Sequence, residues 1–445
     1  MSTIEKHDMT QGKILLPLVS FTIPLVLGNL FQLTYNAADS VIVGKYVGEQ
    51  ALAAVGTSTP IMNIAILLIS GMCMGASVLM SSQYGAKDYD TLSRQISTTM
   101  LAGCGFSVVF SLLMLLLANP VLRLIRVPET AIPEAAAYLR IIFMGLIFTF
   151  MYNFLANTMR ALGDSKTPLY FLVTSAFLNI FGDLFFVVVL RWGAIATVCS
   201  EGLCCLLCGI YIKKKIPLLC LGKKWWVFDK SLLGKTVSYG STSAMQQVCL
   251  QLGKLIIQSV VNTQGVAVMA AFTAVNRVDD FAYTPQQNIG HAMTTFLAQN
   301  KGAGHKERMK KGFQTGLLIE LVYSIGLFCV IWGLAPQIMT LFAEDGDAQV
   351  VSLGISYLHL ISWMYILPGL TNGVQGFFRG IGDLKVTLYS TFMNMFGRVV
   401  AVFVMIRLLQ MEFASLAWAN MVGWIVMLLF EVPLLVKSMR NGECG

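Results

Sequence analysis

Charged side chains are scarce in this sequence, and their scarcity excludes a soluble globular protein. Asp, Glu, Lys and Arg make up 12% of the 445 residues, and a soluble domain has about twice that share. Hydrophobic residues make up 56% of the chain, and the mean hydropathy is +0.70. We therefore predict an all-α polytopic membrane protein.

Patterns for metal and nucleotide binding are also missing. Most of the 10 cysteines lie in apolar runs, where a thiol acts as a small hydrophobic group. Cys204, Cys205 and Cys208 have helical spacing but no neighbouring His, so we expect no metal cluster there. There is no Gly-x-x-x-x-Gly-Lys-Ser/Thr loop, which excludes ATP as the direct energy source. We expect no cofactor.

One stretch resembles a catalytic motif. Gly380-Ile-Gly-Asp383 matches the Gly-x-Gly-Asp signature of intramembrane aspartyl proteases, whereas its repeat copy Ala161-Leu-Gly-Asp164 lacks the first glycine. Both stretches lie beside Arg and Lys, as turns between helices do. We predict that the protein is not an enzyme.

Apolar spans are abundant. Cutting the sequence at charged or turn-rich breaks gives twelve, which predict twelve transmembrane helices. They begin near Ile14, Ala51, Leu92, Ile132, Pro168, Gly193, Ser231, Val266, Arg308, Val350, Val386 and Phe413.

The basic residues predict how these spans are oriented. With a cytoplasmic N-terminus, 22 of the 31 Lys and Arg fall in inside segments and 5 in outside segments, and such an excess is typical of cytoplasmic loops. We expect a multi-pass plasma (inner) membrane protein with both termini in the cytoplasm. The dense basic stretch from Lys213 to Lys235 is interpreted as an interfacial linker near anionic lipid and not as a nucleic-acid site.

Two copies of one pattern divide the chain. Arg160-Ala-Leu-Gly-Asp-Ser-Lys-Thr-Pro-Leu-Tyr170 recurs 219 residues later as Arg379-Gly-Ile-Gly-Asp-Leu-Lys-Val-Thr-Leu-Tyr389. Repeats with an even number of spans share their orientation, so a two-fold axis along the membrane normal should relate them. We predict two six-helix lobes around a central cavity, residues 1–212 and 231–445, joined by a basic cytoplasmic linker, residues 213–230.

Asp39 is the only charged residue between Ile14 and Lys45. An unpaired acid inside a bilayer costs several kcal/mol, and acids that persist there usually mark an ion or proton path. At a rise of about 1.5 Å per residue, Asp39 lies roughly 9 Å from the outer flank of its span. We predict that it is functional.

Three more oxygen-bearing side chains fall at a similar depth. Asp183 lies roughly 12 Å in from Arg191, and Asn179 is one turn below it on the same face. Thr197 begins the next span in the same layer. Together with Asp39 these groups suit Na⁺ or a shared proton. The alternative is that Asn179 and Asp183 only hydrogen-bond across helices.

Short motifs in a fixed order extend over nearly the whole chain: Tyr35–Gly44, Ala51–Gly56, Gln83–Ala86, Arg160–Pro168, Leu178–Asn179 with Asp183, Gly193–Thr197 and Gln299–Ala303. In this order they resemble the multidrug and toxic compound extrusion (MATE) transporters. The resemblance implies that the first-helix aspartate, the fifth-helix asparagine and aspartate and a sixth-helix threonine form a cation or proton site. By position these are Asp39, Asn179, Asp183 and Thr197.

The second lobe departs from another pattern of that family. Some members place coupling acids on the seventh and tenth helices, but the tenth span here, around Met364, has no acid. The repeat partner of Asp183 is Arg398. A second-lobe Na⁺ site of that kind is therefore not expected.

Asp279 and Asp280 lie about halfway through the eighth span, close to Arg277. We expect an internal ion-pair network with Lys254 or Arg398, because pairing neutralises charges that the membrane penalises. The alternative is that one of the two acids attracts a cationic substrate.

The predicted substrate cavity includes Gln32, Tyr35 and Asn153, together with polarizable side chains from a chain that holds 24 Met and 27 Phe. Pro24 removes a backbone hydrogen bond and permits a bend in the first helix. MATE transporters resemble this chain in having such a proline.

These features predict a secondary active efflux transporter. It would export cationic or amphipathic drugs and toxins in exchange for inward H⁺ or Na⁺ by alternating access, and one chain would form a functional monomer. The alternative is a lipid-linked oligosaccharide flippase of the same superfamily, which Arg277, Arg398 and Lys254 would suit because its cargo is anionic.

Overall fold

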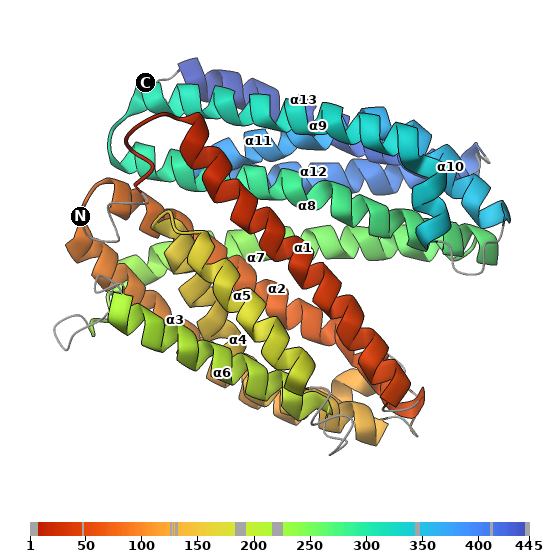
Figure 1. The fold of residues 1–445 in the computed structure, drawn as a ribbon, viewed down its shortest axis with the longest axis horizontal. Coiled ribbons are helices and arrows are strands. Elements are labelled where there is room, and N and C mark those ends of the chain that lie inside the picture. Colours follow the sequence, from red (N-terminus) through yellow and green to blue (C-terminus); the bar gives the residue numbers. More distant parts are fainter. Residues whose placement is uncertain are drawn as a thin grey trace. The chain divides into compact units, whose positions relative to one another are not determined.

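The computed structural model describes residues 8–46, 49–124, 127, 129, 132–182, 193–215, 226–342, 348–409 and 413–440. Within these ranges every regular element is helical, which confirms the predicted all-α class (Figure 1). The helices correspond to the twelve predicted spans, and the tenth span is split by a short 3₁₀ turn. They are α1 (Leu15–Tyr46), α2 (Glu49–Gly85), α3 (Tyr89–Leu124), α4 (Ile132–Ala161), α5 (Lys166–Gly182), α6 (Gly193–Lys215), α7 (Lys230–Val261), α8 (Val266–Gly302), α9 (Lys306–Phe342), α10 (Ala348–Ser362), η6 (Trp363–Tyr365), α11 (Ile366–Ile381), α12 (Leu384–Phe403), η7 (Val404–Leu408) and α13 (Ser415–Arg440).

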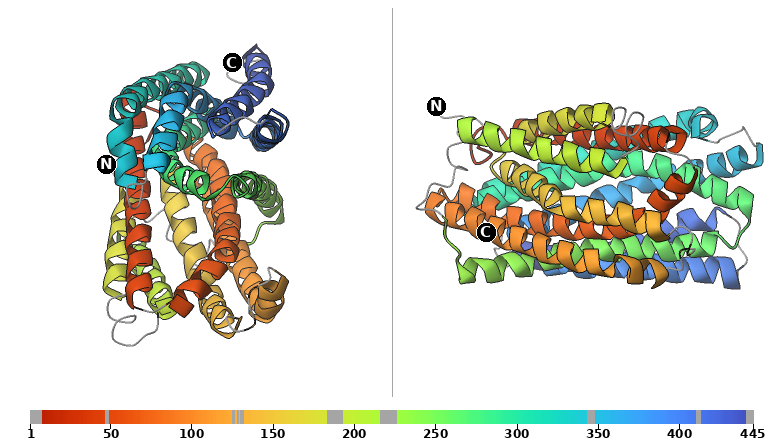
Figure 2. Two further views of the ribbon diagram at one scale, coloured as in Figure 1. Left: turned by 90° about the vertical axis from the view of Figure 1, so that its right-hand side faces the viewer. Right: turned by 90° about the horizontal axis from the view of Figure 1, so that it is seen from below.

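Contacts divide the chain into two compact units. Unit 1 holds Ile23–Ala244, and unit 2 holds Met9–Thr22 with Met245–Gly445. Within each unit the helices run roughly alongside one another (Figure 2). The lobe and linker boundaries predicted from the sequence stay a prediction.

Large apolar side chains face outward along the helices. Leu116 of α3 and Leu341 of α9 are 79% and 80% exposed, an arrangement that lipid favours and water opposes. Eight helices of the described ranges are long and apolar enough to cross a membrane. The outward apolar faces therefore agree with a membrane protein.

In unit 1, α2 packs closely against α7 at two glycines of α2, Gly71 and Gly75. A Cβ atom placed on Gly71 would lie 2.5 Å from the Cα of Ala244, and one on Gly75 would lie 2.5 Å from the carbonyl carbon of Tyr239. Such small residues let two backbones approach closely, and this is how helices associate in membranes.

Unit 2 packs α8 against α11 in the same way. A Cβ atom on Gly376 would lie 2.7 Å from the carbonyl oxygen of Gly290, and one on Gly380 would lie 2.5 Å from the Cβ of Leu297. The backbones of these two helices therefore approach each other closely.

The repeated Gly-Asp pair forms the same turn in both copies. Gly163 precedes α5 with a φ of 88°, and Gly382 precedes α12 with a φ of 86°. Asp164 accepts hydrogen bonds from the backbone N–H groups of Lys166 and Thr167 at the start of α5. These stretches are turns between helices, as predicted, which argues against a protease motif.

Asp88 ends the turn before α3. The backbone N–H of Thr91 donates to Asp88 Oδ1 over 3.1 Å. Hydrogen bonds from Thr91 lower the pKa of this exposed carboxyl, because they favour its charged form. A carboxyl with a lowered pKa stabilises the fold at neutral pH, and that contribution is lost as the pH falls through the folded-state pKa.

Candidate functional site

α1 and α5 run in the same direction and are in contact within unit 1. A Cβ atom on Gly28 would lie 3.4 Å from Leu172, and further along, the rings of Phe31 and Phe177 lie 6.2 Å apart. Asp39 comes two turns after Phe31, so its part of α1 extends toward the same end of unit 1 as the end of α5.

The first turns of α6 lie toward the same end of unit 1 as the end of α5. Phe171, near the start of α5, packs edge-on against Tyr211, near the end of α6, with ring centroids 5.4 Å apart. The two helices therefore run in opposite directions, and the first turns of α6 lie toward the end of α5. Thr197 belongs to those turns.

The predicted coupling residues are placed only in part. Asp39, Asn179 and Thr197 lie in α1, α5 and α6, but their side chains are outside the described residues, and so is all of Asp183. The helix directions suit a common site, and the site itself stays a prediction.

The predicted cavity residues of unit 1 differ in exposure. Gln32 is exposed on α1, and Asn153 is half-buried on α4, where its Nδ2 donates to the carbonyl of Thr149 over 2.9 Å. The side chain of Tyr35 is outside the described residues. Contact with a substrate stays a prediction for all three predicted lining residues.

Pro24 is buried in α1, one residue after unit 1 begins at Ile23. The proline therefore lies where the chain passes from unit 2 to unit 1, a suitable position for a bend. Its role as a bending residue stays a prediction.

Asp279 lies in a buried group of tyrosines. It is 5% exposed on α8, and its carboxylate accepts hydrogen bonds from the hydroxyls of Tyr365 and Tyr357, the latter over 3.2 Å. Asn420 Nδ2 donates to the Tyr357 hydroxyl over 2.9 Å. Tyr283 packs edge-on against Tyr365 with centroids 5.4 Å apart. Hydroxyl donors thus hold an acid for which the sequence predicted an ion pair.

Asp280, one residue later, is the more accessible acid. Its Oδ1 lies 3.6 Å from Lys254 Nζ, and both side chains are about half exposed. This ion pair confirms the sequence prediction for Asp280 and Lys254. A role of either acid in substrate binding stays a prediction.

A second buried polar network joins four helices of unit 2. Gln375 Oε1 accepts from Gln246 Nε2 over 3.2 Å and from Arg379 Nη2 over 3.0 Å. Gln375 Nε2 donates to Thr391 Oγ1 over 3.0 Å, and Arg379 Nη1 lies 3.2 Å from His291 Nδ1. These hydrogen bonds tie α7, α8, α11 and α12 together, while Arg379 Nε is buried without a partner among the described residues.

The repeat seen in the sequence is also seen by comparison with known families. The family model described as MatE matches the chain twice, over residues 24–185 and 243–404. The second match begins and ends 219 residues after the first, the same offset as the Gly-Asp turns. The chain belongs to the MatE family.

The similarity of this MATE-family chain to known proteins supports its membership of the family. It is 31% identical to the probable multidrug resistance protein YpnP and 28% identical to the probable multidrug resistance protein YoeA, both of Bacillus subtilis. These matches cover 86% of each chain for YpnP, and 84% of this chain and 82% of YoeA. Its fold is similar to the outward-facing conformation of a multidrug resistance MATE transporter, with a TM-score of 0.90, 21% identity and 100% and 99% of the two chains covered. It is a polytopic membrane transporter, and its family is not one of enzymes.

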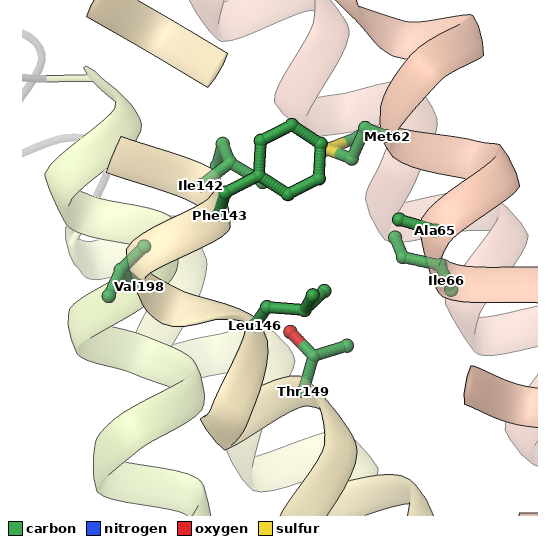
Figure 3. Close-up of a pocket in the computed structure, with 8 residues that line it drawn as sticks. All are labelled: Met62, Ala65, Ile66, Ile142, Phe143, Leu146, Thr149 and Val198. Atoms are coloured by element: carbon green, nitrogen blue, oxygen red, sulfur yellow. The ribbon is translucent and has the colours of Figure 1, made fainter. Parts of the chain in front are cut away.

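A small cavity in unit 1 of this MATE transporter lies between α2, α4 and α6 (Figure 3). Its volume is about 30 Å³, and apolar side chains line most of it, among them Met62, Phe143 and Val198. Drug-sized ligands need at least about 300 Å³. This cavity is therefore a packing defect with room for a water molecule, and it is not the substrate site.

Sequence reasoning missed the two tyrosine partners of Asp279 and Asn420, which contacts one of those tyrosines. Tyr357, Tyr365 and Asn420 lie 78, 86 and 141 residues further along the chain, in spans that otherwise look apolar. No local pattern signals that they meet, because only the packing of α8 against α10, η6 and α13 brings them together.

Proposed function

We propose that this chain exports cationic or amphipathic drugs and toxins in exchange for inward H⁺ or Na⁺ by alternating access. The observation that carries the proposal is its similarity over 86% of its length to a relative named a probable multidrug resistance protein. The transported substrates are small molecules that reach the protein from the membrane or the cytoplasm.

The proposed coupling site consists of Asp39, Asn179, Asp183 and Thr197. The parallel course of α1 and α5 and the antiparallel course of α6 support it, because they direct the positions of Asp39, Asn179 and Thr197 toward one end of unit 1. Oxygen ligands of this kind suit Na⁺ or a shared proton.

Exchange requires that the ion and the drug disfavour each other's bound state. Such a coupling is reciprocal, since each ligand changes the affinity for the other by the same factor. The drug would load in the inward-open form and the ion in the outward-open form, and the binding of each would promote the release of the other.

The test is efflux of a fluorescent cationic dye from liposomes that contain the purified protein. A Na⁺ gradient and a pH gradient are imposed separately. Efflux driven by one gradient alone is expected, and it would name the ion. Folded protein that moves dye under neither gradient would contradict the proposal.

The coupling site is tested in the same assay with Asp39→Asn and Asp183→Asn. Each is expected to abolish coupled efflux while expression stays normal, because an amide cannot carry the charge or the proton. Asp383→Asn is the matched control, since Asp383 is exposed and makes no side-chain capping bond at α12. Full efflux by either site variant would contradict the assignment.

A further inference from the structure

Glu320 of α9 is a fully buried acid that no part of the proposed function uses. It is 0% exposed, and neither of its carboxyl oxygens has a hydrogen-bond partner among the described residues. It lies 14 residues, about 21 Å, beyond the start of the helix. A charge at that depth would be costly.

The groups around Glu320 are rich in acceptors. A Cβ atom placed on Gly369 would lie 3.4 Å from Glu320 Oε2, 3.3 Å from Gln286 Nε2 and 2.8 Å from Ser324 Oγ, so these polar groups share one spot. Gln286 Nε2 donates hydrogen bonds to Ser324 Oγ over 3.1 Å and to the carbonyl of Tyr365 over 2.8 Å. Gln286 Oε1 is buried and accepts no hydrogen bond from the part of the chain that the structure describes.

The donors at this spot are already used. The Ser324 hydroxyl donates to the carbonyl of Glu320 in its own helix over 2.7 Å and lies 3.3 Å from the carbonyl of Tyr365. The cluster thus has two groups with unsatisfied acceptors, Glu320 and Gln286. One added hydrogen on Glu320 would supply the donor that the cluster lacks.

The cluster lies at the break in the tenth span. Tyr365 ends the 3₁₀ turn η6, and Pro368 follows in α11 with no N–H to donate to the carbonyl one turn before it. Broken membrane helices with exposed carbonyls are where transporters bind ions and protons. Tyr365 also connects this cluster to Asp279, to which its hydroxyl donates.

We propose that Glu320 is a proton-binding site of unit 2, in which the protonated carboxyl donates its one hydrogen bond to Gln286 Oε1 beside the helix break. Loss of this proton would leave a buried anion, which is costly at this depth in a membrane. The site is separate from the Asp39 group in unit 1.

Titratable groups on the packed helices have other partners. The Tyr323 hydroxyl donates to the carbonyl of Ala282 over 3.1 Å, and the His359 ring packs on Trp332 with centroids 4.7 Å apart. The Tyr365 hydroxyl donates to Asp279, and Arg379 contacts His291 and Gln375. Among the described residues no basic side chain forms an ion pair with Glu320.

The proposal is tested by infrared spectroscopy of the purified protein in lipid at neutral pH. The wild-type spectrum minus that of Glu320→Gln is expected to show the carbonyl band of a protonated carboxylic acid, shifted in D₂O. Glu307→Gln is the matched control, because Glu307 is exposed in the first turn of the same helix and should leave the band unchanged.

Absence of the band would overturn the proposal, since the carboxyl would then be ionised. Loss of the band on adding Na⁺ at fixed pH would also overturn it, in favour of a cation site. If Glu320→Gln does not fold, Glu320→Asp keeps a carboxyl in a changed position. Its band should then move, and an unchanged spectrum would contradict the assignment.

A transport consequence rests on the proposed function. Glu320→Gln cannot release a proton, so loss of efflux under a pH gradient with retained dye binding is expected. If the infrared band is observed but Glu320→Gln still shows full efflux, Glu320 binds a proton that it does not release during transport. Wild-type protein that moves dye under no gradient would contradict the proposed function alone, and the infrared result would stand.

Discussion

At the scale of single residues, an acid in an apolar run is the most informative feature of this chain. Asp39 was found by that rule. Glu320 is the only charged residue between Lys311 and Glu344, and Glu431 the only one between Glu412 and Lys437. Both are 0% exposed. Applied to every span, the rule predicts these positions as well, and the structure supplies the neighbours that give Glu320 its proposed role.

The hydroxyls of Tyr357 and Tyr365, which both donate to Asp279, should stabilise unit 2. Tyr365→Phe and Tyr357→Phe each remove one donor, and leaving a buried acceptor short of a partner costs about 1–3 kcal/mol. We expect each variant to lower the thermal stability of the purified protein in detergent.

The double variant provides the control for that prediction. Because both hydroxyls donate to one carboxylate, their effects should not add, as is usual for residues of one network. Tyr389→Phe is a matched surface substitution, since Tyr389 is exposed on α12. Strictly additive losses would show that the two hydroxyls act independently.

At the scale of helices, glycines set how closely α8 and α11 approach. Gly376→Ala would place a Cβ atom 2.7 Å from the carbonyl oxygen of Gly290, which forces the backbones apart. Overpacking of this kind costs about 1–3 kcal/mol. A lower melting temperature is expected. Gly326→Ala in α9 meets nothing within 4 Å and should leave the melting temperature unchanged or higher.

The side chain of Arg308 contacts three carbonyls of the segment before α1. Arg308 Nη1 donates to the carbonyl of Gly12 over 2.6 Å, and Nη2 donates to those of Gln11 over 2.8 Å and Met9 over 3.1 Å. A guanidinium presents five N–H donors in a rigid planar fork, whereas an ammonium presents three on a flexible stem.

Arg308→Lys should therefore release this segment while α9 stays folded. We expect faster amide hydrogen exchange over residues 9–12, measured by mass spectrometry. Lys310→Ala, an exposed neighbour on α9, is the control. Unchanged exchange in Arg308→Lys would show that Gln299 and Asn300, which also contact Met9, suffice to hold the segment.

At the scale of the whole molecule, the excess of Lys and Arg in alternate loops predicts that both termini lie in the cytoplasm. A reporter that folds only in the cytoplasm is expected to be active when fused after Gly445. The same reporter inserted after Arg126, in a segment predicted to face outward, should be inactive. The reverse pattern would invert the orientation.

The sequence by itself determined that the chain is a membrane protein of twelve helical spans in a 219-residue repeat, because bilayer length, apolar composition and repetition are properties of contiguous residues. It also marked Asp39, Asn179, Asp183 and Thr197 as a candidate site, through depth along each helix and resemblance to a family. Only the tertiary structure decided that Asp279 is held by Tyr357 and Tyr365 and that Arg308 holds the segment before α1. It also decided that Glu320 lies near Gln286 and, within the described part of the chain, receives no hydrogen bond. These contacts join residues tens to hundreds of positions apart, and side-chain packing between helices, which no local pattern encodes, selects them.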